Sequence, residues 1–530
     1  MSLQNEIMFE TDGRHSSVYL YEPPMGERQY VECIDELVDL GIDTISYVVG
    51  DCAVLLYDTK VGELWGHNVD LANHTVWLRA AQNVKSMIER GIDPLKLVCD
   101  HSHKRGFKFI PHLLLNMVHT PHGRVTDCRV ADFTTDHPEW QVGQEPDFPE
   151  SKNDQPRRLS YAIDEVRENR LAVIKELLFD YDSDGIELNF YTYSPFIARK
   201  EVDEHTTTLT NWLTEIRKLA TEASKIQKRE KRIFVRIGAS LNGNLLMGHD
   251  IATWIKNELV DVLVAMPVKG DFGTDISDLQ QIVNLTKNSQ TKIIAGIDSV
   301  SSEQTPKVQR AAVANVYDAG VKGCMYHRYY PDPNRYPYST EDTNRLRFLA
   351  YPDLIEHMDK IFHMGPSKDR DKPEKIFGVN PQLPKVLSLS EPPTPISIYI
   401  ADDIQSKLSM GELWKCELRI MINNLMQNGD VSVVWNDKKI APEKIRWADW
   451  IFQMRPRPDY VRGYRLHIPL EKDLLPQKGQ NTISISLDSK DPQLVLDIEI
   501  TDIDVIVEYL PHKNAIRDDE EYSGGSLFTP

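Results

Sequence analysis

Hydrophobic and polar positions change their spacing in a regular way along the first two thirds of the chain. Short apolar runs that alternate with polar residues, as in strands, are separated by longer runs with the 3.6-residue spacing of helices. Strand and helix units repeated eight times predict a (β/α)8 TIM barrel, with a doubly wound open sheet as the runner-up. The predicted strands are 18–21, 44–49, 107–115, 186–191, 233–239, 260–266, 292–297 and 323–330.

The run 186–191 is the most informative of these strands because its polar face carries Glu187, Asn189 and Tyr191. A strand covered by helices usually buries both faces, and burying a carboxylate or an amide without a partner is costly. We therefore expect these three side chains to line a cleft or the mouth of the barrel. The Asp-Gly turn before the run resembles the turn before the fourth strand of many (β/α)8 glycoside hydrolases.

The pattern changes near Pro366. Residues 366–385 are rich in Lys, Asp and Pro and predict a linker after a barrel domain of residues 1–365. Short alternating runs separated by turn signals then predict a C-terminal β-sandwich over 386–512. Residues 513–530 predict a flexible acidic tail. The sandwich can serve as a lid, a glycan-binding module or a dimer contact, and a homodimer is left open.

Charge and targeting signals exclude several classes of partner. The chain has 530 residues, 61 of them basic and 80 acidic, with a formal net charge of −19. This balance argues against nucleic acid, whose binding depends on basic side chains, and against an anionic membrane surface. No signal peptide is visible in the first residues, so the default expectation is a cytoplasmic protein. No nucleotide-binding glycine motif is present, and we expect no cofactor.

The carboxyl ends of barrel strands are where active residues gather, and this rule selects candidate side chains. Each also has a structural interpretation: Glu187 can pair with Arg236 on the neighbouring strand, Asp12 can cap a turn, and His137 can anchor a loop. His101 and His103 have the His-x-His spacing of metal-dependent barrels but lie at a helix end, where we expect surface or capping histidines. We therefore predict no metal site.

Several segments together carry a resemblance to a known family. They are Asp12-Gly-Arg-His, Asp136-His-Pro-Glu-Trp140 and Asp184-Gly-Ile-Glu-Leu, with 41–51, 103–110 and 159–167. The chain resembles bacterial glycoside-hydrolase-like barrels with a C-terminal β-sandwich, and within that group it is most similar to the inverting exo-sialidases. The resemblance covers the predicted barrel.

The resemblance implies a catalytic aspartate and histidine, which are Asp12 as the acid and His137 as the base that activates water. Inversion requires the two groups to stand ~6.5–9.5 Å apart, so that water can enter between them. A sialic acid carboxylate would be bound by arginine in a fork. The expected substrate-binding residues are Asn116, Glu187, Asn189, Arg236, Arg328 and Arg129.

The leading hypothesis is thus an inverting exo-sialidase that releases terminal sialic acid from a sialylated glycan. A glycosidase on another sugar, with Glu187 as acid or base, is the first alternative. A non-catalytic carbohydrate-binding barrel is the second, because Asn189 and Tyr191 stand where related barrels carry catalytic carboxylates.

Overall fold

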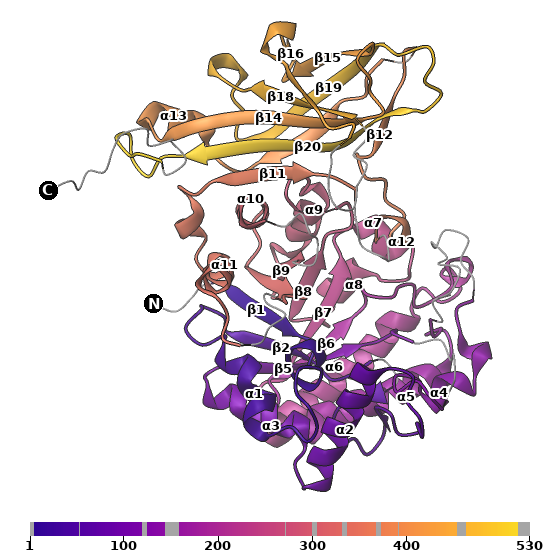
Figure 1. The fold of residues 1–530 in the computed structure, drawn as a ribbon. Coiled ribbons are helices and arrows are strands. Elements are labelled where there is room, and N and C mark those ends of the chain that lie inside the picture. Colours follow the sequence, from indigo (N-terminus) through magenta and orange to yellow (C-terminus); the bar gives the residue numbers. More distant parts are fainter. Residues whose placement is uncertain are drawn as a thin grey trace, which may run out of the picture.

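Eight parallel strands form a closed barrel, as the sequence predicts (Figure 1). The computed structural model describes residues 5–51, 54–118, 125–143, 158–270, 272–298, 305–330, 336–366, 373–390, 392–452 and 463–517. Neighbouring strands follow one another around the barrel in the order β1, β2, β5, β6, β7, β8, β9 and β10. Their bounds are β1 Glu6–Thr11, β2 Thr44–Val48, β5 Lys108–Leu114, β6 Gly185–Asn189, β7 Arg232–Gly238, β8 Val262–Met266, β9 Lys292–Asp298 and β10 Gly323–His327.

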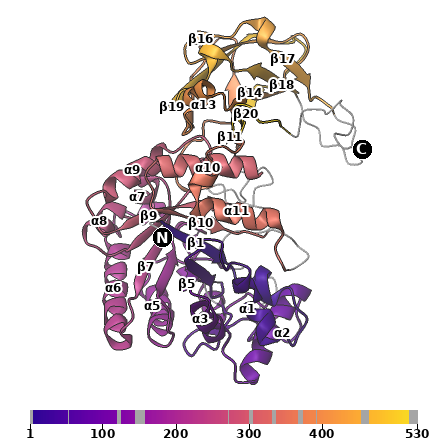
Figure 2. The same cartoon turned by 90° about the vertical axis from the view of Figure 1, so that its left-hand side faces the viewer.

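Amphipathic helices cover the outside of the barrel and bury its outward-facing apolar residues (Figure 2). The helices between the strands are α1 Glu27–Asp35, α2 Thr75–Glu89, α3 Pro94–Lys104, α5 Asp164–Phe179, α6 Thr208–Gln227, α7 Leu241–Leu245, α8 Ile251–Lys256, α9 Ser277–Thr286 and α10 Pro306–Asp318, with α11 Thr340–Ala350 after β10. No helix among the described residues is long and apolar enough to cross a membrane.

The first strand is β1, Glu6–Thr11, so the prediction of a strand at 18–21 is wrong. Residues Arg14–Val18 form a π-helical turn instead. The apolar part of β1 is short, and it is bounded by Glu6 and Glu10, both of which are buried. Charged residues that point into a barrel break the apolar pattern from which strands are predicted, which explains why β1 was missed.

The C-terminal region contains two further sheets and lies beside α9 and α10 (Figures 1 and 2). One sheet has the order β11, β20, β14, β18, β17, with β12 also paired to β20; the other has the order β13, β19, β15, β16. Their bounds are β11 Lys360–Met364, β12 Lys385–Leu387, β13 Ile396–Ile400, β14 Leu413–Asn423, β15 Asp430–Trp435, β16 Lys438–Lys439, β17 Arg446–Asp449, β18 Gly463–Pro469, β19 Gly479–Ser489 and β20 Ile498–Tyr509, with helix α13 Ile404–Met410 after β13.

Strand β11 belongs to the C-terminal sheet although the predicted boundary at residue 365 places it in the barrel domain. Asn315 of α10 connects the two parts: its Oδ1 accepts a hydrogen bond from the Ala401 amide at 3.0 Å, and its Nδ2 donates to the Tyr399 carbonyl at 3.2 Å. The Tyr399 amide also donates to the Thr274 carbonyl at 2.8 Å. Most of the predicted tail, residues 518–530, lies outside the described residues.

The described part of the predicted linker packs on the barrel instead of crossing open space. Helix α12, Pro373–Ile376, is followed by Phe377, which is fully buried and stacks on Tyr191 with ring centroids 5.8 Å apart. Gly238 makes room for this ring, because a Cβ at Gly238 would lie 2.3 Å from it. Arg199 holds the helix by donating to the Lys375 carbonyl at 3.0 Å.

Phe377→Ala tests whether this segment is part of the folded barrel. We expect the free energy of unfolding to fall by about 3–5 kcal/mol, because the substitution empties a fully enclosed aromatic site. Urea denaturation of the full chain measures this change. Phe452, which is 55% exposed, supplies the matched control, and Phe452→Ala should stay within about 0.5 kcal/mol of wild type. Equal stability of the two variants would contradict the packing described here.

Candidate functional site

A polar layer fills the barrel interior directly above an apolar layer. Met8, Ile110, Phe234 and Met325 belong to the apolar cluster inside the barrel. Side chains alternate along a strand, so the residue two positions later points the same way. On these four strands that residue is polar and buried: Glu10, His112, Arg236 and His327. The polar layer therefore stands one step nearer the carboxyl ends of the strands, where active sites of this fold form.

Arg236 is the centre of the polar layer. Its Nε lies 2.7 Å from Glu187 Oε1, and its Nη1 forms an ion pair with Glu10. Arg236 and Glu187 are fully buried. Burial alone would raise the pKa of Glu10, but the charges of Arg236 and His327 outweigh it and hold that pKa well below its ordinary value. The Arg236 guanidinium is therefore ion-paired with two carboxylates inside the protein.

Two histidines complete this layer. His327 Nδ1 lies 2.8 Å from Glu10 Oε2. Asn189 Oδ1 accepts hydrogen bonds from the amides of Tyr191 and Thr192, so its Nδ2 is the group that donates to His112 Nε2 at 3.1 Å. Burial lowers the pKa of His112 to about 4, against the opposing effect of Glu187, so this imidazole is neutral at neutral pH.

A pocket opens above this layer at the carboxyl end of the barrel. Its volume is about 110 Å³, and Glu10 and His327 of the polar layer form part of its lining. Carboxylate, guanidinium, imidazole and phenol groups share the pocket with aliphatic side chains. The other lining residues are Asp12, Arg14, Val48, Leu114, Met117, Tyr191, Thr192, Tyr193, Arg328, Tyr330 and Ile376.

Asp12 is held in the wall of the pocket by several donors. Its Oδ1 accepts hydrogen bonds from the amides of Arg14 and His15 at 3.0 and 2.8 Å, and its Oδ2 is bonded to the His15 ring and to the Tyr330 hydroxyl, the latter at 3.2 Å. Burial would raise the pKa of Asp12, but the hydrogen bond and charge of His15, together with Arg14, lower it to about 2. Asp12 is therefore a carboxylate at neutral pH.

His137 is not among the residues that line this pocket. Its ring stacks on Trp140 with centroids 3.6 Å apart, and its Nδ1 lies 2.9 Å from Glu139 Oε1. These are the contacts of a histidine that anchors its loop. Its pairing with Asp12 in catalysis stays a prediction.

Of the other predicted substrate-binding residues, only Arg328 lines the pocket. Asn116 is buried and connects two loops through the Pro195 carbonyl and the Leu159 amide. Arg129 lies over the Trp77 ring and forms an ion pair with Asp127. Glu187, Asn189 and Arg236 belong to the polar layer beneath the pocket, and Glu187 makes the pairing with Arg236 that its structural interpretation foresees.

The His-x-His spacing does not bring the rings of His101 and His103 to one site. His101 Nε2 lies 2.7 Å from Asp35, whereas His103 Nε2 lies 2.8 Å from Asp184, so the two rings bind different aspartates. Glu10, Arg14 and Ile376 line the pocket but were not selected from the sequence. Glu10 was missed with β1, and Ile376 belongs to the predicted linker, whose composition gives no signal of a pocket wall.

A family model described as Glycosyl hydrolase-like 10 matches residues 14–313, which is more than half of the chain. The chain belongs to this family. The matched range includes six barrel strands, β2 and β5 to β9, while Glu10, Asp12 and His327 of the pocket lie outside it. No curated protein matches the sequence.

Three of the similar solved structures are glycoside-processing enzymes with remote sequences. A maltogenic alpha-amylase, AmyB from Thermotoga neapolitana, is 12% identical with a TM-score of 0.37, and the match covers 92% of this chain and 100% of that one. Alpha-L-fucosidase isoenzyme 2 from Paenibacillus thiaminolyticus is 13% identical with a TM-score of 0.41, covering 66% and 49%. The alpha-galactosidase TtGalA from Thermus thermophilus is 12% identical with a TM-score of 0.37, covering 66% and 65%.

These matches are too distant to bear on the substrate. The chain spans about half the length of the fucosidase and all of the amylase. The resemblance found in the sequence is confirmed for the glycosyl hydrolase-like family as a whole. The comparisons do not support the exo-sialidase family.

Asp12→Asn tests the electrostatics of the pocket wall. The pKa of Asp12 is about 2 in the folded chain against an ordinary 3.8, so its charge stabilises the fold above pH 3.8 and that contribution is lost as pH falls toward 2. Between pH 5 and pH 3 wild type should lose about 1 kcal/mol more of its unfolding free energy than the variant. Urea denaturation at each pH measures the difference.

The control is Asp58→Asn, which changes a carboxylate of the same type whose side chain is 41% exposed. Its unfolding free energy should decline in parallel with that of wild type over the same pH range. If the Asp12→Asn curve also runs parallel to wild type, the carboxylate is not held in the environment described here.

Proposed function

We propose that the chain is a glycoside hydrolase that removes a terminal sugar at the pocket at the carboxyl end of the barrel. The observation that carries this proposal is the convergence of the carboxylate of Asp12 and the imidazole of His327 on one small pocket. Tyr191, Tyr193 and Tyr330 provide the aromatic surface that stacks on sugar rings, and the charged groups can bind hydroxyls.

The size of the pocket favours a single sugar ring. Its volume of about 110 Å³ is smaller than the ~300–1,000 Å³ typical of sites for drug-sized ligands. A chain of several sugars would need a longer groove than this. We therefore assign exo action, in which one terminal residue enters the pocket and the rest of the glycan stays outside.

The pKa of Asp12 limits the catalytic role that it can have. A carboxyl with a pKa of about 2 holds no proton at neutral pH, so Asp12 supplies none to the leaving oxygen. This differs from the acid role that the sequence resemblance implies. An ionised carboxylate in the pocket wall can instead act as a base toward water, or stabilise the positive charge that develops on the sugar.

His327 is the group to which we assign proton transfer. Glu10 binds its Nδ1 at 2.8 Å, and a carboxylate bound to one ring nitrogen fixes the orientation of an imidazole. Glu10 is in turn held by Arg236, which keeps its charge in place. Histidine as a residue type is a competent acid or base near neutral pH. Arg236 therefore holds Glu10, and Glu10 orients His327 toward the pocket.

The arginines of the pocket bear on the choice of sugar. Arg14 is ion-paired with Asp51 and lies 3.6 Å from Asp12, so its charge is balanced within the protein. This favours a neutral sugar over sialic acid. If the substrate carries a carboxylate, Arg328 is the pocket arginine that we assign to it. A sialoside is therefore included among the substrates that test the exo-sialidase hypothesis.

A panel of fluorogenic aryl glycosides, with a sialoside among them, tests the proposal. We expect turnover of at least one neutral glycoside, and a loss in kcat of about 10²–10⁴-fold in Asp12→Asn and in His327→Gln. Asp58→Asn is the control and should retain wild-type kcat. Binding of monosaccharides without turnover of any glycoside would contradict catalysis and favour the carbohydrate-binding alternative.

His137→Ala separates the two assignments of the proton-transfer group. If His327 carries the proton, His137→Ala keeps its kcat, since the ring lies on Trp140 outside the pocket lining. A loss equal to that of Asp12→Asn, with His327→Gln still active, would instead support the pair implied by the sequence. Proton NMR of the released anomer then reports whether configuration is inverted.

A further inference from the structure

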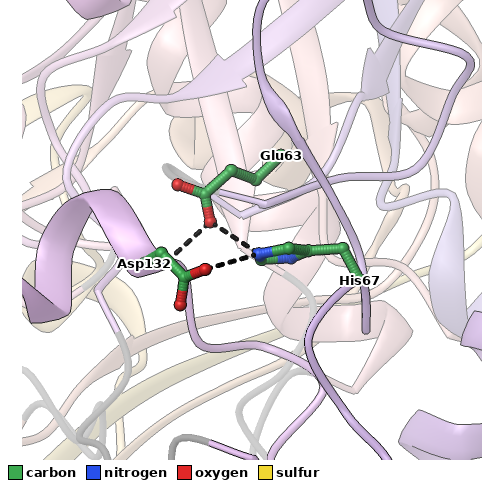
Figure 3. Close-up of side chains that lie close together, drawn as sticks. All are labelled: Glu63, His67 and Asp132. Carbon is green, nitrogen blue, oxygen red and sulfur yellow. Dashed lines mark hydrogen bonds and ion pairs between the residues drawn. The ribbon is translucent and has the colours of Figure 1, made fainter.

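Three potential metal ligands converge on two loops at the carboxyl end of the barrel. Glu63 in β4, Glu63–Leu64, and His67 just after it belong to the connection from β2 to α2. Asp132 opens α4, Asp132–Thr135, in the connection from β5 to α5. Figure 3 shows that the Glu63 and Asp132 carboxylates both point at the same edge of the His67 ring. The ligand atoms all lie within 4.8 Å of one another.

The distances from His67 Nε2 are short and nearly equal. They are 3.1 Å to Glu63 Oε2 and 3.2 Å to Asp132 Oδ2. A cation bound with tetrahedral geometry and bonds of ~2.0–2.2 Å would separate its ligands by about 3.3–3.6 Å. The two distances from His67 Nε2 are therefore already close to the spacing of a mononuclear transition-metal site.

The hydrogen bond of His67 Nδ1 determines whether Nε2 carries a hydrogen in the neutral ring. His67 Nδ1 is 3.0 Å from the Leu64 carbonyl oxygen, which can only accept a hydrogen bond, so Nδ1 carries a hydrogen. In the neutral ring Nε2 then presents a lone pair to two anionic oxygens, which is repulsive. Either a proton on Nε2 or a bound cation removes this repulsion. The same arrangement, with one ring nitrogen bonded to a backbone carbonyl, is usual for histidines that bind metals.

The carboxylates are also fixed before any cation arrives. Glu63 accepts hydrogen bonds from the backbone amides of Asp132 at 2.7 Å and Phe133 at 2.8 Å. Asn68 Nδ2 donates to Asp132 Oδ1 at 2.9 Å and leaves Oδ2 directed at His67. Ligands that need no reorganisation lose little conformational entropy on binding, so their arrangement favours affinity.

We propose that Glu63, His67 and Asp132 bind one divalent transition cation of the Zn²⁺ class. An imidazole ligand argues against Ca²⁺ and Mg²⁺, which prefer sets of oxygen ligands. Three protein ligands leave a fourth position for water, and the half-exposed side chains give access to it. The cation ties together the two loops that follow the strands carrying Val48 and Leu114 to the pocket. It therefore braces the pocket and is independent of the reaction proposed there.

Cobalt and zinc titrations of the full chain, after treatment with a chelator, test this proposal. We expect wild type to bind Co²⁺ with visible d–d absorption, and Zn²⁺ to displace it. His67→Asn keeps a donor for the Leu64 carbonyl but removes the ligating nitrogen. Its Zn²⁺ affinity should fall by at least about 100-fold, the upper end of what loss of an outer hydrogen-bond partner of a metal ligand costs.

His74→Asn is the matched control, because His74 lies in the same connection with its ring stacked on Trp77. It should bind Zn²⁺ as wild type does. Asp132→Asn supplies a second variant should His67→Asn fail to fold, because its Oδ1 can still accept the hydrogen bond from Asn68, and it should also weaken binding. Zn²⁺ affinity that is equal in wild type, His67→Asn and Asp132→Asn would overturn the proposal and assign the gap to a proton on His67.

Discussion

The arrangement of the barrel interior depends on the ion pairs of Arg236. A guanidinium without a partner inside a protein is very costly, and so is each of the carboxylates that it binds. Glu10 comes from β1 and Glu187 from β6, so one side chain of β7 connects its neighbour β6 to β1 on the opposite side of the barrel. Because each of these buried charges depends on the others as partners, their positions are restricted, and the residues bonded to them are restricted in turn.

The ion pairs of Arg236 also restrict the side chains that form the floor of the pocket. Glu10 orients His327, and Asn189 uses its amide both to bind His112 and to shape the backbone at Tyr191 and Thr192. A charged layer whose groups are hydrogen-bonded to one another therefore forms the floor of the pocket. Rigid support beneath a reactive group keeps it within the small positional tolerance that catalysis requires.

The sequence was sufficient for the barrel, and for most of its strands it was accurate to one or two residues. The predicted runs 233–239 and 292–297 correspond to β7, Arg232–Gly238, and β9, Lys292–Asp298. These strands bury apolar residues on both faces, so local pattern and tertiary structure agree. The exception, β1, places Glu6 and Glu10 inside the barrel, where they pair with Arg232 and Arg236 more than 200 residues away. No local pattern contains that information.

The site was predictable only in part, for a related reason. Asp12 was selected from its place near the start of the barrel and lines the pocket, whereas His137, selected from the same resemblance, does not line it. The cluster of Glu63, His67 and Asp132 joins two separate loops and has no motif spacing. Such groupings depend on how long connections fold back on each other, and a single sequence does not report this.

The segment after β11 has a consequence for dividing this protein into parts. Ile376 borders the pocket and Phe377 fills the space above Gly238, yet both follow a strand that belongs to the C-terminal sheet. A barrel truncated at residue 365 would keep all eight of its strands and still lack one side of its cavity. Genetic separation of the two regions would thus leave the barrel with an incomplete pocket, so the smallest complete unit extends past the barrel itself.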